Sequence, residues 1–374
     1  MNIIPKLISL LIIMTISNVT QANVEISKYI TKNGIKVLYS KSGNIPMIDI
    51  RITFDAGSNK DGDLKGISML THSLLDEGTS KMDAESIASV FESNGSVFNT
   101  SVNKDKSSIS LRSLTEKKYL NPSIKMFLSI LSDSVFPKNE TQLQKDRTLT
   151  SIVEDETDAA EVASSLFFKE IYSDYPYAYN TIGQKNTVKK ITRKDILNFY
   201  KKNINIGNAS IVIVSSLPKK EVIDISEKIS KSLNLTVKEI FEDKVLSDIN
   251  KEKNIYKKFS SEQAHIYIGG LSIERGSKNH LPLYVGNYIF GGSGFSARLM
   301  QELRVKRGLT YGVYSYIHPM KNTGPFVIGI ETKSEQAQES VKLIHKMLRE
   351  FYKNGPTDKE LSLIHISEPT RRRG

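Results

Sequence analysis

The amino-acid sequence predicts an α+β protein made of two homologous sheet-plus-helices domains, the second of them truncated. Each half shows the same order of elements: strands, two helices, a strand pair and a long helix. A charged stretch without periodicity, 233–258, lies between the halves and is typical of an inter-domain linker. The chain has 374 residues, 39% of them hydrophobic, which suits about two globular domains. We therefore expect an N-terminal domain at 23–232 and a C-terminal domain at 259–361.

Hydrophobic periodicity defines the elements of the first domain. Apolar residues recur at helical spacing over 65–77 and again over 83–93, where Asn94 and Gly95 give a stop signal. Alternating or β-branched runs predict strands between turn residues. The expected strands are 35–40, 47–56, 97–102, 107–114 and 209–215, and the remaining helices are 120–135, 140–172 and 192–202.

The second domain repeats this order after the linker. Its apolar runs are bounded by glycine-rich and charged turns. The expected strands are 264–271, 309–317 and 326–332, and the expected helices are 282–290, 296–306 and 334–353.

The N-terminus has the features of a secretion signal. Residues 1–6 carry a positive charge, 7–16 are almost purely apolar, and Ala22 offers a cleavage site. The apolar run is too short to span a bilayer comfortably. We expect a signal peptide over 1–22, either cleaved or retained as an anchor, and a periplasmic or secreted protein.

The C-terminus departs from the pattern of the chain. A helix is expected to begin near Asp358, but the stretch from Ser362 onward resembles translated read-through of a sequencing adapter. We expect 362–374 to be a non-native tail, and the natural end of the C-terminal domain to be missing.

Composition excludes several chemistries. The chain has no cysteine, so disulfides, thiolate metal sites and cysteine nucleophiles are absent. The net charge is +11, but lysine pairs such as Lys117 with Lys118 and Lys257 with Lys258 are spread along the chain without interleaved aromatics. We therefore expect no nucleic-acid partner, while a loose attraction to anionic lipid or acidic peptides stays open.

The glycine-rich segment 291–315 carries the most specific motif. Arg304, near the end of a predicted helix, offers a planar fork of donors, and Tyr311 can donate to an oxygen that gains charge during a reaction. Spacing alone favours an ordinary helix–turn–strand with Arg304 solvated and Tyr311 packed in the sheet. With its glycine run and flanking pattern, the segment resembles the C-terminal-domain signature of the pitrilysin/insulinase (inverzincin) zinc peptidases, which include the processing peptidases. This resemblance implies that Arg304 and Tyr311 grip the substrate backbone near the scissile bond.

The first half resembles the same family from Asn33 onward. Residues 47–57 are similar to its opening strand, and 92–100 are similar to the segment that follows its active-site helix. The resemblance implies that Asn99 contacts the main chain of the substrate.

The segment 66–79 stands where the family keeps its metal-binding helix. Catalytic members carry H-x-x-E-H there: the two His bind zinc, the Glu is the general base, and a distant Glu completes the site. Here Met69 and Ser73 occupy the two ligand positions and His72 occupies the base position, while the distant position near 150–151 has no Glu. Thioether and hydroxyl groups are poor ligands for Zn²⁺. The comparison implies no metal site and no catalytic residue on this chain.

Other candidate sites are weaker. His72 lies off the apolar face of its predicted helix, so we expect it to be exposed in the cleft. The acidic run 154–158 lacks the glycine and spacing of a calcium loop and favours a solvated helix. The remaining histidines do not pair with one another or with an acid at metal-binding spacing; they are His265, His280, His318, His345 and His365.

The leading interpretation is a non-catalytic, substrate-binding subunit of a two-chain zinc metallopeptidase of the insulinase family, which degrades or processes peptides. A partner subunit would carry the H-x-x-E-H helix and the zinc, and this chain would supply Arg304 and Tyr311 in trans. The peptide would be held as an added strand in a chamber between the halves. Two alternatives stay open: a stand-alone peptide-binding or scaffold protein without proteolysis, and a metallopeptidase with an unrecognised site.

Overall fold

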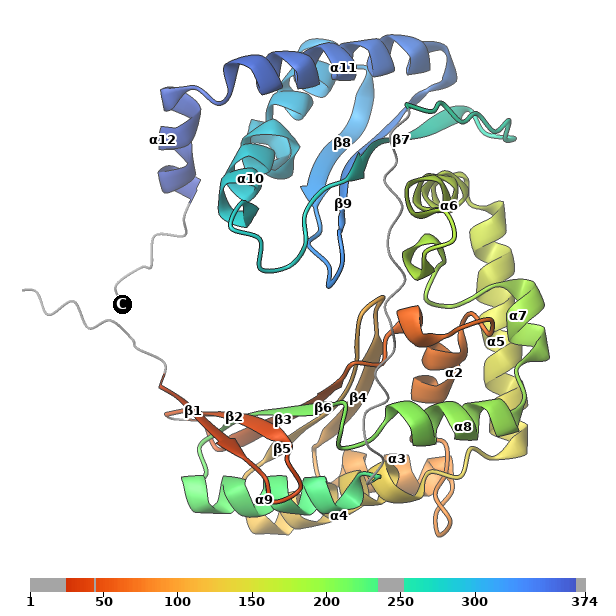
Figure 1. Cartoon of the computed structure of the whole chain (residues 1–374), viewed down its shortest axis with the longest axis vertical. Coiled ribbons are helices and arrows are strands. Elements are labelled where there is room, and N and C mark those ends of the chain that lie inside the picture. Colours follow the sequence, from red (N-terminus) through yellow and green to blue (C-terminus); the bar gives the residue numbers. More distant parts are fainter. Residues whose placement is uncertain (1–24, 44, 235–251, 368–374) are drawn as a thin grey trace, which may run out of the picture.

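The computed structural model of the chain describes residues 25–43, 45–234 and 252–367 (Figure 1). The expected signal peptide, most of the expected linker and residues 368–374 lie outside the described residues. Two sheets, one in each half, organise the structure, and helices pack around them. The predicted α+β fold with two sheet-plus-helices halves is therefore confirmed. No helix within the described ranges is long and apolar enough to cross a membrane.

The N-terminal half is built on a six-stranded sheet in the order β1-β2-β6-β3-β5-β4. The strands are β1 (Ile26–Ile30), β2 (Lys36–Lys41), β3 (Met47–Phe54), β4 (Val97–Val102), β5 (Ser107–Leu114) and β6 (Ala209–Ser215). β2 and β6 run parallel, and the other neighbours are antiparallel. In β3, every second residue from Ile48 to Phe54 is almost fully buried, as the period of a half-buried strand requires.

Helices cover this sheet in two groups. Figure 1 shows α3, α4 and α9 against one face of the sheet, and α2, α5, α7 and α8 beside it. The helices are α2 (Ile67–Ser73), α3 (Ala84–Ser93), α4 (Lys117–Asp133), α5 (Lys138–Thr157), α6 (Ala159–Tyr172), α7 (Lys185–Lys190), α8 (Arg193–Asn203) and α9 (Lys219–Ser232), with short 3₁₀ turns η1 (Ser58–Lys60) and η2 (Pro176–Ala178). The sheet shares one large core with these helices, except that the buried residues of α6 and η2 form a separate cluster.

Several helix boundaries differ from the sequence-based expectation. The helix expected over 65–77 is helical only at α2, because Gly66 fixes its start in a left-handed conformation. The helix expected over 140–172 is divided, because the Asp158 carboxylate accepts the N–H groups of Ala160 (2.7 Å) and Glu161 (3.0 Å) and caps a new helix. The elements β1, α7 and α9 were not predicted.

The C-terminal half is built on a three-stranded antiparallel sheet in the order β7-β9-β8. Its strands are β7 (Gln263–Leu271), β8 (Thr310–Ile317) and β9 (Pro325–Lys333), and its helical segments are α10 (His280–Asn287), η3 (Tyr288–Gly292), η4 (Gly294–Ser296), η5 (Met300–Lys306), η6 (Ser334–Gln336), α11 (Ala337–Asn354) and α12 (Asp358–Ser367). Ile344 and Phe351 of α11 belong to the same core cluster as the strand residues Ile328 and Ile330. The change of sequence pattern at Ser362 does not end α12, which continues through Ser367.

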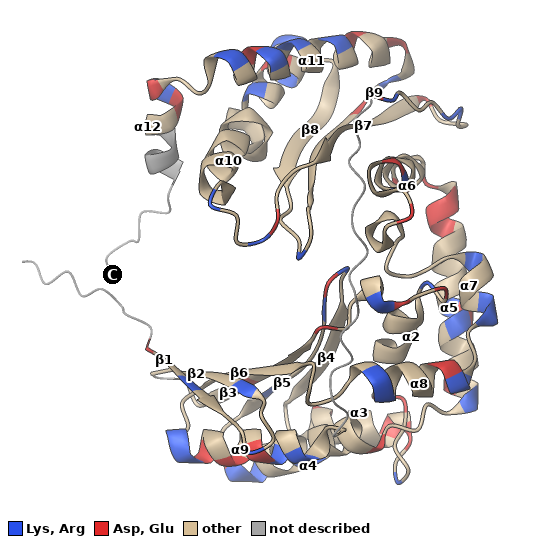
Figure 2. Cartoon of the chain, viewed as in Figure 1, with Lys and Arg blue, Asp and Glu red and all other residues tan. Residues whose placement is uncertain are grey.

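The two halves meet along α6 and η2. β7 packs against α6, and Met320 and Leu271 of the C-terminal half join a cluster around Tyr172 and Tyr177 of the N-terminal half. Figure 2 shows Lys and Arg distributed over the helices of both halves, with Asp and Glu interspersed. The charge is therefore spread over the described surface, as the lysine spacing in the sequence indicates.

Candidate functional site

The helix α2 is held in place by backbone packing at its first residue. Gly66 has φ +100°, and a Cβ atom there would lie 2.7 Å from the carbonyl oxygen of Ile182. Gly183 has φ +92°, and a Cβ atom there would lie 2.3 Å from the carbonyl oxygen of Lys65. Each glycine thus lets two backbones touch where another residue would clash. Gly66, at the start of the segment where the family keeps its metal-binding helix, therefore has a structural use in this chain.

A buried carboxylate completes the start of α2. Asp61 accepts the backbone N–H groups of Gly66 (2.7 Å) and Ser68 (3.1 Å), which would otherwise lack partners at the helix N-terminus. Burial raises the pKa of Asp61 to about 6, although these hydrogen bonds act to lower it. Asp61 was not predicted, because a capping residue so far before its helix has no local sequence signature.

The residues at the family's metal positions cannot form its zinc site. Met69 and Ser73 are half-buried, and the Ser73 hydroxyl donates to the Leu70 carbonyl oxygen (3.2 Å) within the helix. The Thr150 hydroxyl likewise donates to the backbone carbonyl oxygen of Asp146 within α5 (3.0 Å), and Ser151 is exposed. In the part of the chain that the structure describes, no three His, Cys, Asp or Glu residues are grouped as metal ligands. These donors do not fit the catalytic zinc that the family uses.

The expectation that His72 is exposed in the cleft was wrong. Its side chain is 1% exposed, because α8, β4 and α5 all pack around the short helix α2. The ring Nδ1 lies 2.8 Å from the Ser68 carbonyl oxygen, which assigns the proton to Nδ1, and Nε2 has no hydrogen-bond partner among the described residues. Burial lowers the pKa of His72 to about 4, so the ring is neutral at pH 7.

Arg304 is held by an aromatic side chain that sequence reasoning missed. Its guanidinium carbon lies 4.7 Å from the centre of the Phe295 ring, and Phe295 is itself exposed at the end of the glycine run. A guanidinium stacked on a ring keeps its N–H edges available to carbonyl groups. The sequence does contain one signal for this contact: an aromatic residue, Phe295, directly follows the glycine run. A flexible loop has no need of an aromatic side chain at that position.

A tight turn and a β-bulge place Tyr311. Gly308, at φ +62°, donates its N–H to the Arg304 carbonyl oxygen (3.0 Å) and turns the chain from η5 into β8. The pairing of β8 with β9 then shifts between Thr310 and Gly312, so Tyr311 is the extra residue of a bulge. Its side chain is 82% exposed. The structure thus differs from the alternative in which Tyr311 is packed in the sheet.

Asn99 lies in the other half, on β4. This strand has one neighbour among the described strands, β5, and α2 packs beside it. The Asn99 side chain is exposed, while its carbonyl oxygen accepts the hydroxyl of Ser110 (3.3 Å). The structure brings Arg304 and Tyr311 together on η5 and β8, but no described hydrogen bond or ring contact joins them to Asn99. A role in peptide binding stays a prediction for all three residues.

Comparisons with known proteins agree with this geometry. The family model described as "Insulinase (Peptidase family M16)" matches residues 36–185, and the model described as "Peptidase M16 inactive domain" matches 190–365. A Helicobacter pylori protein named "Non-peptidase homolog YmxG" is 27% identical over 361 residues, which cover 94% of this chain and 82% of that protein. A Bacillus subtilis protein named "Uncharacterized zinc protease YmxG" is 25% identical, covering 90% of this chain and 81% of that protein.

A solved structure is similar over almost the same length. The structure described as a peptidase M16 inactive domain from Pseudomonas fluorescens has 31% sequence identity and a TM-score of 0.87, and the match covers 92% of this chain and 84% of that one. Its matching fold and the family models cover both halves of the chain. The chain belongs to the insulinase family, peptidase family M16, and has Met69-Leu70-Thr71-His72-Ser73 where catalytic members carry H-x-x-E-H.

Proposed function

We propose that this protein is the substrate-binding subunit of a two-chain zinc peptidase that degrades or processes peptides. A partner subunit of the same family would carry the H-x-x-E-H motif and its zinc, and this chain would contribute Arg304 and Tyr311. One observation carries the proposal: the zinc positions are replaced by half-buried side chains, while Tyr311 is exposed on a bulge and the half-buried Arg304 stacks on the exposed Phe295. A relative named a non-peptidase homologue supports the non-catalytic part of this assignment.

The chemistry of these side chains suits an extended peptide. The edge of β4 that no described strand covers can pair with a peptide main chain, and the Asn99 amide can donate to or accept from that main chain. The Arg304 guanidinium can donate N–H groups to peptide carbonyl oxygens. The Tyr311 hydroxyl can donate to an oxygen that becomes negative during cleavage. Together they would bind and orient the peptide, which is what a subunit without a metal can contribute.

The proposed compartment follows from the N-terminus. The apolar run and Ala22 favour export by a signal peptide, so we place the two-chain enzyme in the periplasm or outside the cell.

Reconstitution tests this function. The full chain is mixed with a candidate H-x-x-E-H partner, and cleavage of an unstructured fluorogenic peptide is followed together with complex formation by gel filtration. Arg304→Ala combined with Tyr311→Phe should lower kcat/KM by about 100-fold or more in a complex that still assembles. The matched control is Arg349→Ala combined with Tyr352→Phe on α11, where both residues are exposed. Full activity of the Arg304/Tyr311 variant in an intact complex would sink the proposal.

A second candidate is a stand-alone peptide-binding or scaffold protein. The edge of β4 without a neighbour among the described strands favours it, because strand pairing needs no partner subunit. Binding of the same peptide by the isolated chain, with no cleavage in the presence of any family partner, would favour this candidate. Stoichiometric zinc in the purified isolated chain would instead revive a metallopeptidase with an unrecognised site.

A further inference from the structure

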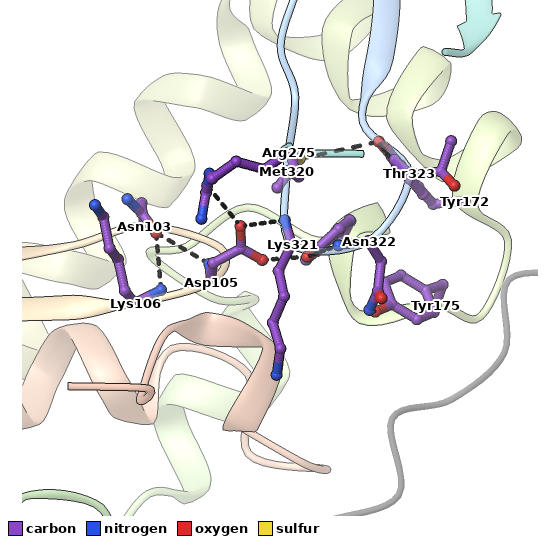
Figure 3. Close-up of polar contacts among 11 residues, drawn as sticks. Asn103, Asp105, Lys106, Tyr172, Tyr175, Arg275, Met320, Lys321, Asn322 and Thr323 are labelled. Carbon is purple, nitrogen blue, oxygen red and sulfur yellow. Dashed lines mark hydrogen bonds and ion pairs between the residues drawn. The ribbon is translucent and has the colours of Figure 1, made fainter. Parts of the chain in front are cut away.

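Contacts between the two halves gather around one buried carboxylate, Asp105, in the turn between β4 and β5. Its side chain is 5% exposed. The carboxylate accepts the Arg275 guanidinium (3.1 Å) and the backbone N–H of Lys321 (2.8 Å), both from the C-terminal half, and the hydroxyl of Tyr177 from the N-terminal half. Figure 3 shows Arg275 and Lys321 reaching Asp105 across this boundary. One carboxylate thus ties together three separate segments.

The turn that carries Asp105 is fixed firmly to the N-terminal half. Asn103 accepts the N–H groups of Asp105 (3.0 Å) and Lys106 (2.9 Å), which closes the turn. The Asn103 carbonyl oxygen accepts the N–H of Ser58 (2.9 Å). The backbone at Gly57 lies against the backbone of this turn, because a Cβ atom on Gly57 would lie 2.4 Å from the backbone nitrogen of Lys106. The position of Asp105 is therefore set by the N-terminal sheet.

The groups that reach Asp105 are equally fixed to the C-terminal half. Arg275 donates its backbone N–H to the Met320 carbonyl oxygen (2.7 Å). This bond joins the segment after β7 to the β8–β9 turn. Gly324 donates to the Ile273 carbonyl oxygen (2.9 Å), a second bond between the same segments. The β8–β9 turn also meets the N-terminal half directly, because Tyr172 donates to the Thr323 carbonyl oxygen (3.1 Å). Movement of the halves relative to each other must therefore disturb the contacts of Asp105.

The strands that end at this contact are the strands that carry the proposed binding residues. β4 holds Asn99 and leads directly into the turn with Asp105. β8 carries Tyr311 as the bulge residue near its start and leads directly into the turn with Lys321. The contact joins the two strands at one end and, together with the packing of β7 on α6, limits the angle between them. A change in that angle would change the distance between Asn99 and Tyr311.

We propose that Asp105 is the polar lock between the two halves and a positioning residue for peptide binding. The polar lock concerns only the contacts of Asp105 between the two halves, whereas the positioning role rests on the proposed function. The charge of Asp105 is matched by Arg275, and its remaining lone pairs are used by Lys321 and Tyr177, as a buried carboxylate requires. Replacing the carboxylate removes the Arg275 ion pair across the boundary, leaves the Lys321–Asp55 and Lys253–Glu170 pairs in place, and loosens the angle between β4 and β8.

The geometry can be measured by pulsed electron paramagnetic resonance on the full chain. The chain has no cysteine, so spin labels can be placed at Lys228→Cys on α9 and Lys342→Cys on α11, both exposed. Asp105→Asn and Arg275→Ala should each broaden or shift the distance distribution between the labels. The Asp49→Asn variant is the control, because Asp49 pairs with Arg112 within the N-terminal sheet (2.6 Å) and should leave the distribution unchanged. An unchanged distribution in both test variants would overturn the lock.

Binding of a fluorescein-labelled, unstructured peptide of mixed composition to the same unlabelled variants tests the positioning role. Asp105→Asn and Arg275→Ala should weaken binding by about tenfold, with the thermal midpoint of Arg275→Ala close to that of Asp49→Asn. Arg275 is half-exposed, so its variant keeps the test valid even where Asp105→Asn folds poorly. A shifted distance with unchanged peptide affinity would overturn the positioning role. Failure of the proposed function appears separately, as unchanged peptide affinity when Arg304 and Tyr311 are replaced.

Discussion

The helix α2 and the η5–β8 segment are the two places where this chain resembles the working parts of a zinc peptidase, and they use their side chains in opposite ways. In α2, His72 is 1% exposed and the helix start is fixed by Gly66 and Asp61. In η5–β8, Tyr311 is 82% exposed and Arg304 rests on Phe295. The first region has become part of the packed core, and the second presents polar groups to solvent.

This difference predicts how substitutions should divide. Changes in α2 should lower the free energy of unfolding, because its contacts are buried and specific to the fold. Changes at Arg304 and Tyr311 should leave that free energy almost unchanged, because neither side chain belongs to the core of the C-terminal half.

The largest expected effect is at Gly66. Gly66→Ala should lower the free energy of unfolding by about 4 kcal/mol, because the left-handed backbone is strained for alanine and the new Cβ meets the Ile182 carbonyl oxygen at 2.7 Å. Gly62→Ala is the control: it has φ +56° but nothing within 4 Å, so strain alone should cost about 1 kcal/mol. Urea unfolding at pH 7 measures both. Equal losses would mean that the packing of α2 against the Ile182 backbone contributes nothing.

The next effect is a pH dependence that depends on His72. The pKa of His72 is about 4 in the folded protein and 6.5 in the unfolded chain, so the unfolded chain binds more protons between these values. The stability from a neutral, buried His72 is therefore fully present above pH 6.5 and is lost as the pH falls to 4, by about 3 kcal/mol. Urea unfolding of the wild type and of His72→Gln at pH 7 and pH 4 isolates this contribution.

Asp61 acts in the opposite direction over the same range. Its pKa is about 6 in the folded protein and 3.8 in the unfolded chain, so the fold gains stability as the pH falls through this window. The wild type should therefore change little between pH 7 and pH 4, whereas His72→Gln should become more stable at pH 4 than at pH 7. A parallel pH dependence in the two proteins would contradict the buried, neutral state of His72.

A smaller effect concerns the cap of α2. Asp61→Ala should lower the free energy of unfolding at pH 7 by about 2 kcal/mol, because two buried N–H groups lose their acceptor. Asp83→Ala removes an exposed cap on α3, where water can replace the carboxylate, and should cost less. Chemical denaturation of both variants at the same pH makes the comparison. A larger loss for Asp83→Ala would show that α2 is not the more tightly held helix.

Sequence patterns predicted most of the strands and located the segments 66–79 and 291–315. They failed where contacts with segments distant in the sequence determine the local structure. Alternation located β3, β5, β8 and β9, because a half-buried strand has period 2 in its own sequence. The break at Asp158 was missed because the acidic run around it is equally good helix sequence. The burial of His72 comes from α8, β4 and α5, none of which is visible in the sequence of α2 itself. Arg304 and Tyr311 were found by resemblance, whereas Phe295 and Asp105 gain their meaning only from contacts in space.

The smallest expected effect is the coupling between Phe295 and Arg304. It tests whether Phe295 holds the Arg304 side chain without contributing to the stability of the fold. Phe295→Ala and Arg304→Ala should each change the free energy of unfolding by less than about 1 kcal/mol, because Phe295 is exposed, Arg304 is half-buried and neither belongs to the core of the C-terminal half. A double-mutant cycle should still give a coupling of about 0.5–1 kcal/mol, the size of an exposed cation–π contact. Tyr352→Phe, which has no ring contact with Arg304 among the described residues, should give no coupling. A coupling of zero for Phe295 would mean that the ring does not hold the guanidinium in solution, and the contrast between a packed α2 and a pre-arranged η5–β8 would then rest on Tyr311 alone.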